Sequence, residues 1–180
     1  FVIVGSAVAM QLLLAHAIYR TPYPEYPGEI LLAFLLVGFA FIGLGLLIAA
    51  LARDVPSVQA IGQCLFLPMI MVGGVGVPLA ALPDWAGTLS AFMPGRYAVD
   101  LLQRCFTDPR GLEGAGFSAA ALVAIGGAAG LAGLRLFRWE PGAKLTRSAL
   151  AWTAAALLAW AVAGFGSVMA GRIHPVFTDA

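Results

Sequence analysis

Side chains suited to acid–base, nucleophilic or metal-binding chemistry are few in this chain, and their spacing matches no common catalytic pattern. The sequence contains no HExxH, GxSxG, CxxC or Walker A motif, the arrangements used by metalloproteases, serine hydrolases, thiol sites and nucleotide-binding loops. Its two histidines, His16 and His174, lie near opposite ends of the chain. The sequence therefore predicts no enzyme active site, no cofactor site and no metal site in this chain.

One group of charged residues is regularly spaced. Arg96, Asp100 and Arg104 are four positions apart, so on a helix they share a face, and neighbouring pairs would attract by about 0.2–0.5 kcal/mol. Apolar residues fall on the opposite face, at positions 97, 98, 101, 102, 105 and 106. Pro94 suits the first turn of this helix, which also carries Tyr97. The charged face could contact a substrate or be solvated.

Uncharged polar residues inside apolar runs form a second candidate set. Gln11 and Gln63 each interrupt a long apolar run, so they could line a polar path or hydrogen-bond to a neighbouring helix. Arg53 and Asp54 form a short charged turn between two such runs. This turn could contact a partner protein or be an ordinary cytoplasmic helix end.

Five runs without Asp, Glu, Lys or Arg would position these side chains. The runs have 19 to 29 residues and cover 1–19, 30–52, 55–83, 114–134 and 148–171. A helix needs about 20 apolar residues to cross the bilayer core, and 61% of the chain is hydrophobic. Membrane β-strands are shorter and alternate in hydropathy. The runs predict an all-α integral membrane protein with about five transmembrane helices, and they exclude a soluble domain, a disordered tail and a basic nucleic-acid binder.

The predicted spans are about 1–19, 29–52, 57–78, 117–137 and 148–171. The second half of the third span is irregular and should kink or unwind, because it contains prolines and glycines at Pro68, Gly73, Gly74, Gly76 and Pro78. Residues 84–106, which follow, combine charges with regularly spaced apolar residues. We predict two short helices there, about 84–92 and 95–106, that enter one interface and return without crossing the membrane.

Lys and Arg residues are concentrated in one connection, where Arg135, Arg138, Lys144 and Arg147 follow one another closely. Because cytoplasmic loops carry an excess of Lys and Arg, residues 53–56 and 138–147 are predicted to be cytoplasmic. Residues 20–29, 79–116 and 172–180 are then predicted to lie outside.

Small residues four positions apart suggest close helix packing in the last two predicted spans. Gly126 and Gly130 form one such pair, and Gly166 and Ala170 form another. Such pairs let helix backbones approach each other closely. They could make contacts between subunits or pack helices within one chain.

Residues 29–137 resemble a known family in the order of their motifs. Residues 45–54 (GLLIAALARD) look like a helix end at the cytoplasm, and an apolar helix with Gln63 and Pro68 follows. Residues 73–78 (GGVGVP) resemble a break at the outer leaflet, and residues 82–85 (LPDW) and 93–100 (MPGRYAVD) resemble a pair of re-entrant helices. The ordered set is similar to the permease subunit of type-2 ATP-binding-cassette (ABC) exporters.

This resemblance implies a transport mechanism without chemistry in the chain itself. Two permease subunits, identical or different, would pair around a path, and ATP with Mg would bind to a separate ABC ATPase subunit below. The predicted spans 1–19 and 57–78 would line the path, the cluster 73–78 would be the hinge, and the re-entrant helices would form an outer gate that allows alternating access. Membrane lipid is the remaining expected partner, and a bacterial inner membrane the expected location.

The resemblance also predicts a division of the chain. Residues 1–137 would be the C-terminal part of a permease domain whose first two spans precede Phe1. Residues 138–180 would be a basic linker followed by an additional span outside the family pattern. Two other functions remain open on sequence grounds: a secondary transporter that uses the irregular third span, or a membrane anchor for a domain beyond residue 180. The transported substrate is not predicted by any motif.

Overall fold

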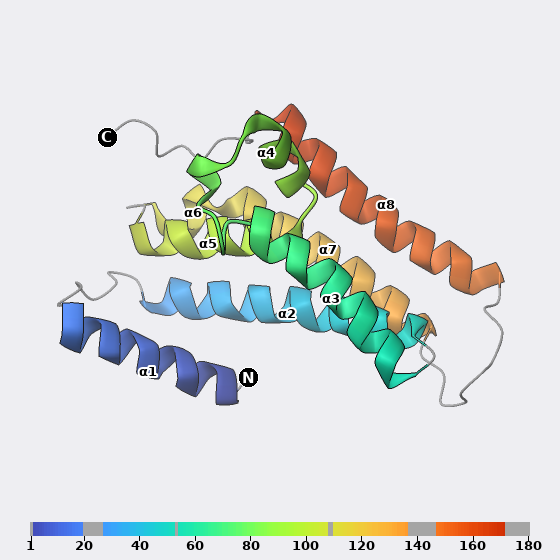
Figure 1. The fold of residues 1–180 in the computed structure, drawn as a ribbon, viewed down its shortest axis with the longest axis horizontal. Helices are drawn as coiled ribbons and strands as arrows, with labels where there is room; N and C mark the ends of the chain where they lie inside the picture. Colours follow the sequence, from blue (N-terminus) through green and yellow to red (C-terminus); the bar gives the residue numbers. More distant parts are fainter. Residues whose placement is uncertain (1, 20–26, 53, 108–109, 137–146, 172–180) are drawn as a thin grey trace.

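The computed structural model describes residues 2–19, 27–52, 54–107, 110–136 and 147–171, and within them it is all-helical (Figure 1). This confirms the predicted all-α membrane fold. The helices in chain order are α1 (Val2–Tyr19), α2 (Pro27–Leu51), α3 (Val55–Val72), the 3-10 turn η1 (Leu79–Ala81), α4 (Asp84–Ser90), α5 (Pro94–Thr107), α6 (Gly111–Gly114), α7 (Gly116–Leu136) and α8 (Arg147–Met169).

Each of the five predicted spans overlaps a helix, although the third was predicted to reach residue 78 and α3 ends at Val72. By length and composition, α2, α3, α7 and residues 151–169 of α8 can cross a membrane. The apolar part found in α1 is shorter, from Gly5 to Ile18. Most of the described side chains of α1 are exposed, including Met10, Leu13 and Ile18.

The centre of the fold is the parallel pair α2 and α7, which make the most extensive helix contact (Figure 1). Glycines bring their backbones together. A Cβ atom added at Gly43 would lie 2.2 Å from the carbonyl oxygen of Gly126, and one added at Gly126 would lie 2.5 Å from Cα of Ala40. We call this contact the α2–α7 seam. Gly126 therefore packs within the chain, which is one of the two interpretations that the sequence left open.

Helices α5 and α8 complete this core. Leu101 and Cys105 of α5 are buried in the same apolar cluster as Leu44 of α2, Leu122 of α7 and Ala156 of α8. Helix α8 packs along α7, and α5 packs against both α2 and α7. We call α2 and α7 the frame, and α5 and α8 pack against it.

A hydrogen bond joins the beginning of α2 to α6. The Glu29 carboxylate accepts from the backbone N–H of Leu112 at 2.7 Å. Gly111, at the start of α6, has φ of +50°, and an added Cβ there would lie 2.0 Å from the Glu29 carboxylate. Glycine at this position allows both the turn and the close approach of Glu29.

Helix α3 stands apart from the frame. Its first turn is capped by Asp54, whose carboxylate accepts from the N–H of Ser57 at 2.8 Å. Met69 is its one buried residue among those that the structure describes, and only 6% of its apolar window is buried, against 33% for α2. Most of the apolar surface of α3 therefore lacks cover from the described parts of this chain.

The predicted break after α3 is confirmed, and it lies at the glycines rather than at Pro68. The helix continues through Pro68 and ends at Val72. Gly74 then adopts φ of +93°, a backbone conformation that glycine tolerates and other residues rarely adopt. The N–H of Gly76 turns back to the carbonyl of Ile70 at 2.8 Å.

Candidate functional site

The predicted pair of short helices is present as α4 and α5, joined by residues 91–93. Helix α5 has 14 residues and α4 has seven, both shorter than the roughly 20 residues of a membrane-crossing helix. The N–H of Met93 donates to the carbonyl of Ser90 at 2.8 Å, and this closes the turn between them. We call α4, the turn 91–93 and α5 the re-entrant pair.

Arg96 fastens the two helices of the pair to each other. Its side chain on α5 donates to the carbonyl of Gly87 at 3.3 Å and to the hydroxyl of Ser90, both on α4. The residue is only 5% exposed. Burial lowers the pKa of the Arg96 guanidinium from its ordinary value, and the charge of the Asp100 carboxylate acts in the opposite direction.

The predicted attraction four positions apart is confirmed between Asp100 and Arg104. Nε of Arg104 lies 2.9 Å from Oδ1 of Asp100. The other carboxylate oxygen of Asp100 accepts from the Ser118 hydroxyl of α7 at 2.5 Å. The ion pair therefore also ties α5 to the beginning of α7.

The interpretation of this charged face as solvated is wrong for Arg96 and Arg104, which are 5% and 8% exposed. Residues of α7 and α8, among them Ser118 and Ser167, lie across the same face. The helical spacing was predicted correctly, but the elements that cover the polar side come from segments distant in sequence. Helix α5 is consequently buried on its apolar face and over much of its polar face.

A cleft of about 410 Å³ opens between α5, α6, α7 and the end of α8. Its walls carry Arg96, Asp100, Arg104, Arg110 and Glu113, three cations and two carboxylates. Guanidinium groups and hydroxyls that converge on one cleft can bind a polar or anionic group through charge-assisted hydrogen bonds. Among the described residues, no group of three or more His, Cys, Asp or Glu could hold a metal ion.

Tyr97 is buried between the turn 91–93 and α8. Its hydroxyl donates toward the carbonyl oxygens of Ala91 and, at 3.2 Å, of Ala163. Burial raises the pKa of the Tyr97 phenol, and a hydrogen bond from Ser167 opposes that shift. The phenol is therefore a neutral hydrogen-bonding group that joins α5 to α8.

Trp160, Gly164 and Phe165 of α8 are site residues that sequence reasoning missed. Nε1 of Trp160 donates to the carbonyl of Phe92, and the rings of Phe92 and Phe165 meet edge to face with centroids 5.3 Å apart. Trp160 offered the one available signal, since an indole N–H in an apolar span needs an acceptor. Nothing in the sequence pointed to that acceptor 68 positions away.

The predicted hinge residues gather where α3 ends beside α5. Gly73 has no room for a Cβ, which would lie 2.2 Å from the carbonyl of Met69. A Cβ atom added at Gly95 of α5 would lie 2.4 Å from Cγ of Met69. Pro68 is exposed within α3, and Pro78 immediately precedes η1. The structure thus places the break against the beginning of α5, while the hinge role stays a prediction.

The remaining predicted residues lie away from the cleft. Gln11 on α1 and Gln63 on α3 are both exposed, and neither lines it. Asp54 caps α3, so its carboxylate has a structural task. Arg53 lies outside the described residues. The path-lining and partner-contact roles of these residues stay predictions.

Comparison with known proteins gives one match. A family model described as ABC-2 type transporter matches residues 2–106, which takes in α1 to α4 and all but the last residue of α5. The match includes the re-entrant pair and the break after α3, and it ends before α7 and α8. Comparisons with curated proteins and with solved structures gave no match.

Proposed function

Because the chain belongs to the ABC-2 type transporter family, we propose that it is the permease subunit of an ATP-driven exporter. The family places it in the membrane as the transmembrane component of an ABC transporter, in which the ATPase is a separate subunit. The proposal adds the direction of transport, outward, and the source of energy. ATP and Mg would bind to the partner ATPase rather than to this chain.

The observation that carries this proposal is the exposure of α3. An apolar helix with 6% of its window buried requires lipid or another protein around it. Exposed Gln63 places a polar side chain on the same helix, and lipid on all sides would leave its amide without hydrogen-bond partners. A second permease subunit facing α3 across a polar path satisfies both the apolar surface and the amide. Helix α1, with exposed Gln11, is the second proposed wall of that path.

Alternating access requires one part of the permease to stay fixed while another part moves relative to it. The α2–α7 seam, with backbones in direct contact at Gly43 and Gly126, suits the fixed part. Helix α3 and the segment 73–78, which contains Gly74 at positive φ, suit the moving part. The re-entrant pair lies between them and would form the gate at the outer end.

The proposed topology puts residues 53–56 and 138–147 in the cytoplasm, near the ATPase, and residues 20–29, 79–116 and 172–180 outside, in a bacterial inner membrane. Single cysteines at Gly142 and Thr107 in a Cys64→Ser, Cys105→Ser background test this. A membrane-impermeant maleimide applied to intact cells should label Thr107→Cys and spare Gly142→Cys. The reverse pattern would contradict the proposed orientation.

The test of the function is purification of the tagged full-length protein from its native membrane. We expect an ABC ATPase subunit to co-purify, and we expect the complex to hydrolyse ATP. Replacing the catalytic glutamate of that ATPase should abolish transport while an ion gradient is still present. Transport that persists in this variant and stops when the gradient is dissipated would contradict the proposal and favour a secondary transporter.

A further inference from the structure

Helix α8 lies outside the family match, yet it makes specific contacts with the re-entrant pair. Trp160 donates its indole N–H to the carbonyl of Phe92, in the turn 91–93. One helical turn further along α8, the carbonyl of Ala163 accepts from the Tyr97 hydroxyl at 3.2 Å. Two polar groups of the pair therefore have partners on a helix more than 60 residues away in sequence.

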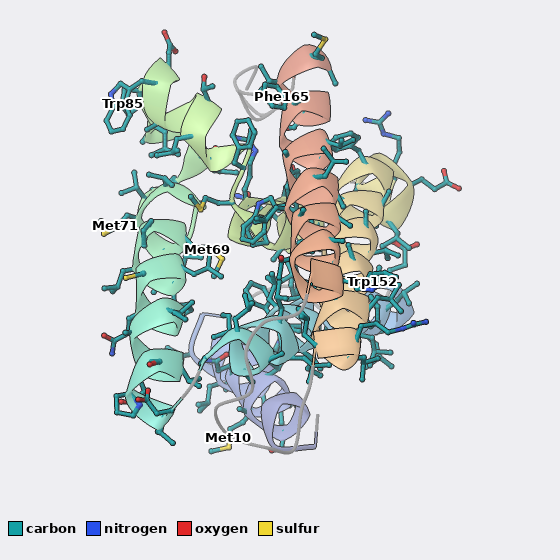
Figure 2. All side chains as sticks on the ribbon, turned by 90° about the vertical axis from the view of Figure 1, so that its right-hand side faces the viewer. Met10, Met69, Met71, Trp85, Trp152 and Phe165 are labelled. Atoms are coloured by element: carbon teal, nitrogen blue, oxygen red, sulfur yellow. The ribbon has the colours of Figure 1, made fainter. Side chains whose placement is uncertain are left out.

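The shape of α8 fits the side chain of Phe92. A Cβ atom added at Gly164 would lie 2.3 Å from Cδ1 of Phe92, so the ring occupies a notch that only glycine provides. Phe165 meets the same ring edge to face, with an interplanar angle of 88°. Figure 2 shows Phe165 on the part of α8 that lies beside the re-entrant helices.

Helix α8 is itself fixed, because it packs along α7 and its Ala156 and Ser167 are buried. Helix α5 is held in addition by α2 and α7. Helix α4 differs from α5. Its most extensive helix contact is with α3, Arg96 of α5 donates to its Gly87 and Ser90, and both Trp85 and Leu89 are exposed. Helix α5 thus packs directly against α2 and α7, whereas α4 is attached through α3 and through Arg96 of α5.

We propose that α8 is a clamp that fixes the turn 91–93 and α5 to the α2–α7 frame. Gating motion is then confined to α3 and the segment 73–83, because Arg96 holds α4 to the clamped α5 through Gly87 and Ser90. Trp160 and Gly164 are positioning residues, since they act on the gate through Phe92. The clamp is a property of the folded chain, and its consequence for gating rests on the proposed permease function.

The first experiment measures amide hydrogen exchange of the full-length protein in lipid vesicles, without nucleotide. Trp160→Phe keeps an aromatic ring and removes the donor to Phe92. Gly164→Ala fills the notch. Both should raise exchange at residues 91–97 by about tenfold, because breaking buried contacts makes local opening easier. Unchanged exchange at 91–97 in both variants would overturn the clamp.

Two matched controls share the same helix. The nearest atom to a Cβ added at Gly166 is Cζ of Phe117, at 3.9 Å, so Gly166→Ala adds the same methyl group at an ordinary contact distance. Trp152→Phe changes a tryptophan at the other end of α8, where its ring contacts Arg135. Both should leave exchange at 91–97 within about twofold of the wild type. An equal rise in the controls would overturn the assignment to Trp160 and Gly164.

Native Cys105, buried on α5, reports whether a variant has lost its fold. It should stay unreactive to maleimide in each of them, since α2 and α7 still cover it. If Gly164→Ala exposes Cys105, that variant is globally altered and Trp160→Phe decides alone.

A second experiment adds a non-hydrolysable ATP analogue to the complex with its ATPase. In the wild type, exchange should rise at 73–83 and stay constant at 91–97, whereas in Trp160→Phe it should change in both segments. A nucleotide response at 91–97 in the wild type would overturn the clamp. If no ATPase co-purifies, the proposed function fails, while the first experiment still decides whether α8 clamps the turn.

Discussion

Helices α2 and α3 follow each other in the chain and are both apolar enough to cross a membrane, yet the protein uses them in opposite ways. Helix α2 presents Ala40 and Gly43 to α7 and packs backbone against backbone. Helix α3 presents Phe66, Leu67 and Met71, which are exposed. In lipid there is little hydrophobic force between helices, so small residues decide which helices pack closely. The difference shows that the pattern of residue size, more than hydropathy, separates the frame from the helix that stands apart.

The largest loss of stability is expected from a substitution at Gly43, in the α2–α7 seam. Gly43→Leu would drive a side chain into the backbone of α7, where a Cβ alone would lie 2.2 Å from the Gly126 carbonyl oxygen. We expect a loss of about 3 kcal/mol or more in the free energy of unfolding, measured by denaturant titration in detergent micelles. Gly45→Leu is the control, because nothing lies within 4 Å of a Cβ at that position. Equal losses in both variants would contradict a close α2–α7 seam.

A smaller effect is expected where the frame holds α5. Asp100→Asn removes the charge that pairs with Arg104 at 2.9 Å and weakens the acceptor for Ser118. Since Arg104 is largely buried, we expect a loss of about 2 kcal/mol in the free energy of unfolding. Glu113→Gln changes an exposed carboxylate of the same cleft and should cost less than about 0.5 kcal/mol. If the order of these two losses were reversed, the ion pair would not hold α5.

A substitution just after the end of α3 is expected to lower the stability of the fold by a smaller amount. Gly74→Ala must place a side chain at φ of +93° with Leu79 Cγ 2.8 Å away, so we expect a loss of about 1–2 kcal/mol. Gly62→Ala within α3 has open space and should be neutral or slightly stabilising. Thermal unfolding of both variants in one detergent gives the comparison. A neutral Gly74→Ala would show that the break tolerates other conformations.

The last prediction concerns which faces of α3 meet water, and its substitutions should leave stability unchanged. Positions 61 and 63 point to opposite faces of α3, and Ile61 and Gln63 are both exposed. If one face of α3 meets a water-filled path and the other meets lipid, Gln63→Cys should react with a membrane-impermeant maleimide about tenfold faster than Ile61→Cys, since the thiolate forms in water. The measurement uses a Cys64→Ser, Cys105→Ser background. Equal labelling rates would count against a path along α3.

The local features of the fold were predictable from the sequence. The long uncharged runs gave the helices, the spacing of Asp100 and Arg104 gave their ion pair, and the glycines at 73–76 gave the break. These features depend on residues within a few positions of one another. Pro68 shows a limit even at this range. Helix α3 continues through this proline and ends at the glycines instead.

The features that could not be predicted depend on distant segments. The polar face of α5 is buried because Ser118 and Ser167 come from α7 and α8. The notch at Gly164 has meaning only once Phe92 lies opposite it. The spacing of residues within a helix predicts which of them share a face. Which helices pack against that face depends on how the spans are arranged in three dimensions.

The α2–α7 seam also has a consequence for biosynthesis. Helix α2 is complete when the ribosome has yet to make α3, the re-entrant pair and α7, so its row of small residues enters the membrane well before its partner exists. During that interval the surface around Ala40 and Gly43 is open to any other helix with small residues. A chain that stops before α7 would keep this surface open permanently. Quality-control proteases and insertion chaperones would therefore meet nascent and truncated chains in the same form, distinguished only by whether α7 arrives.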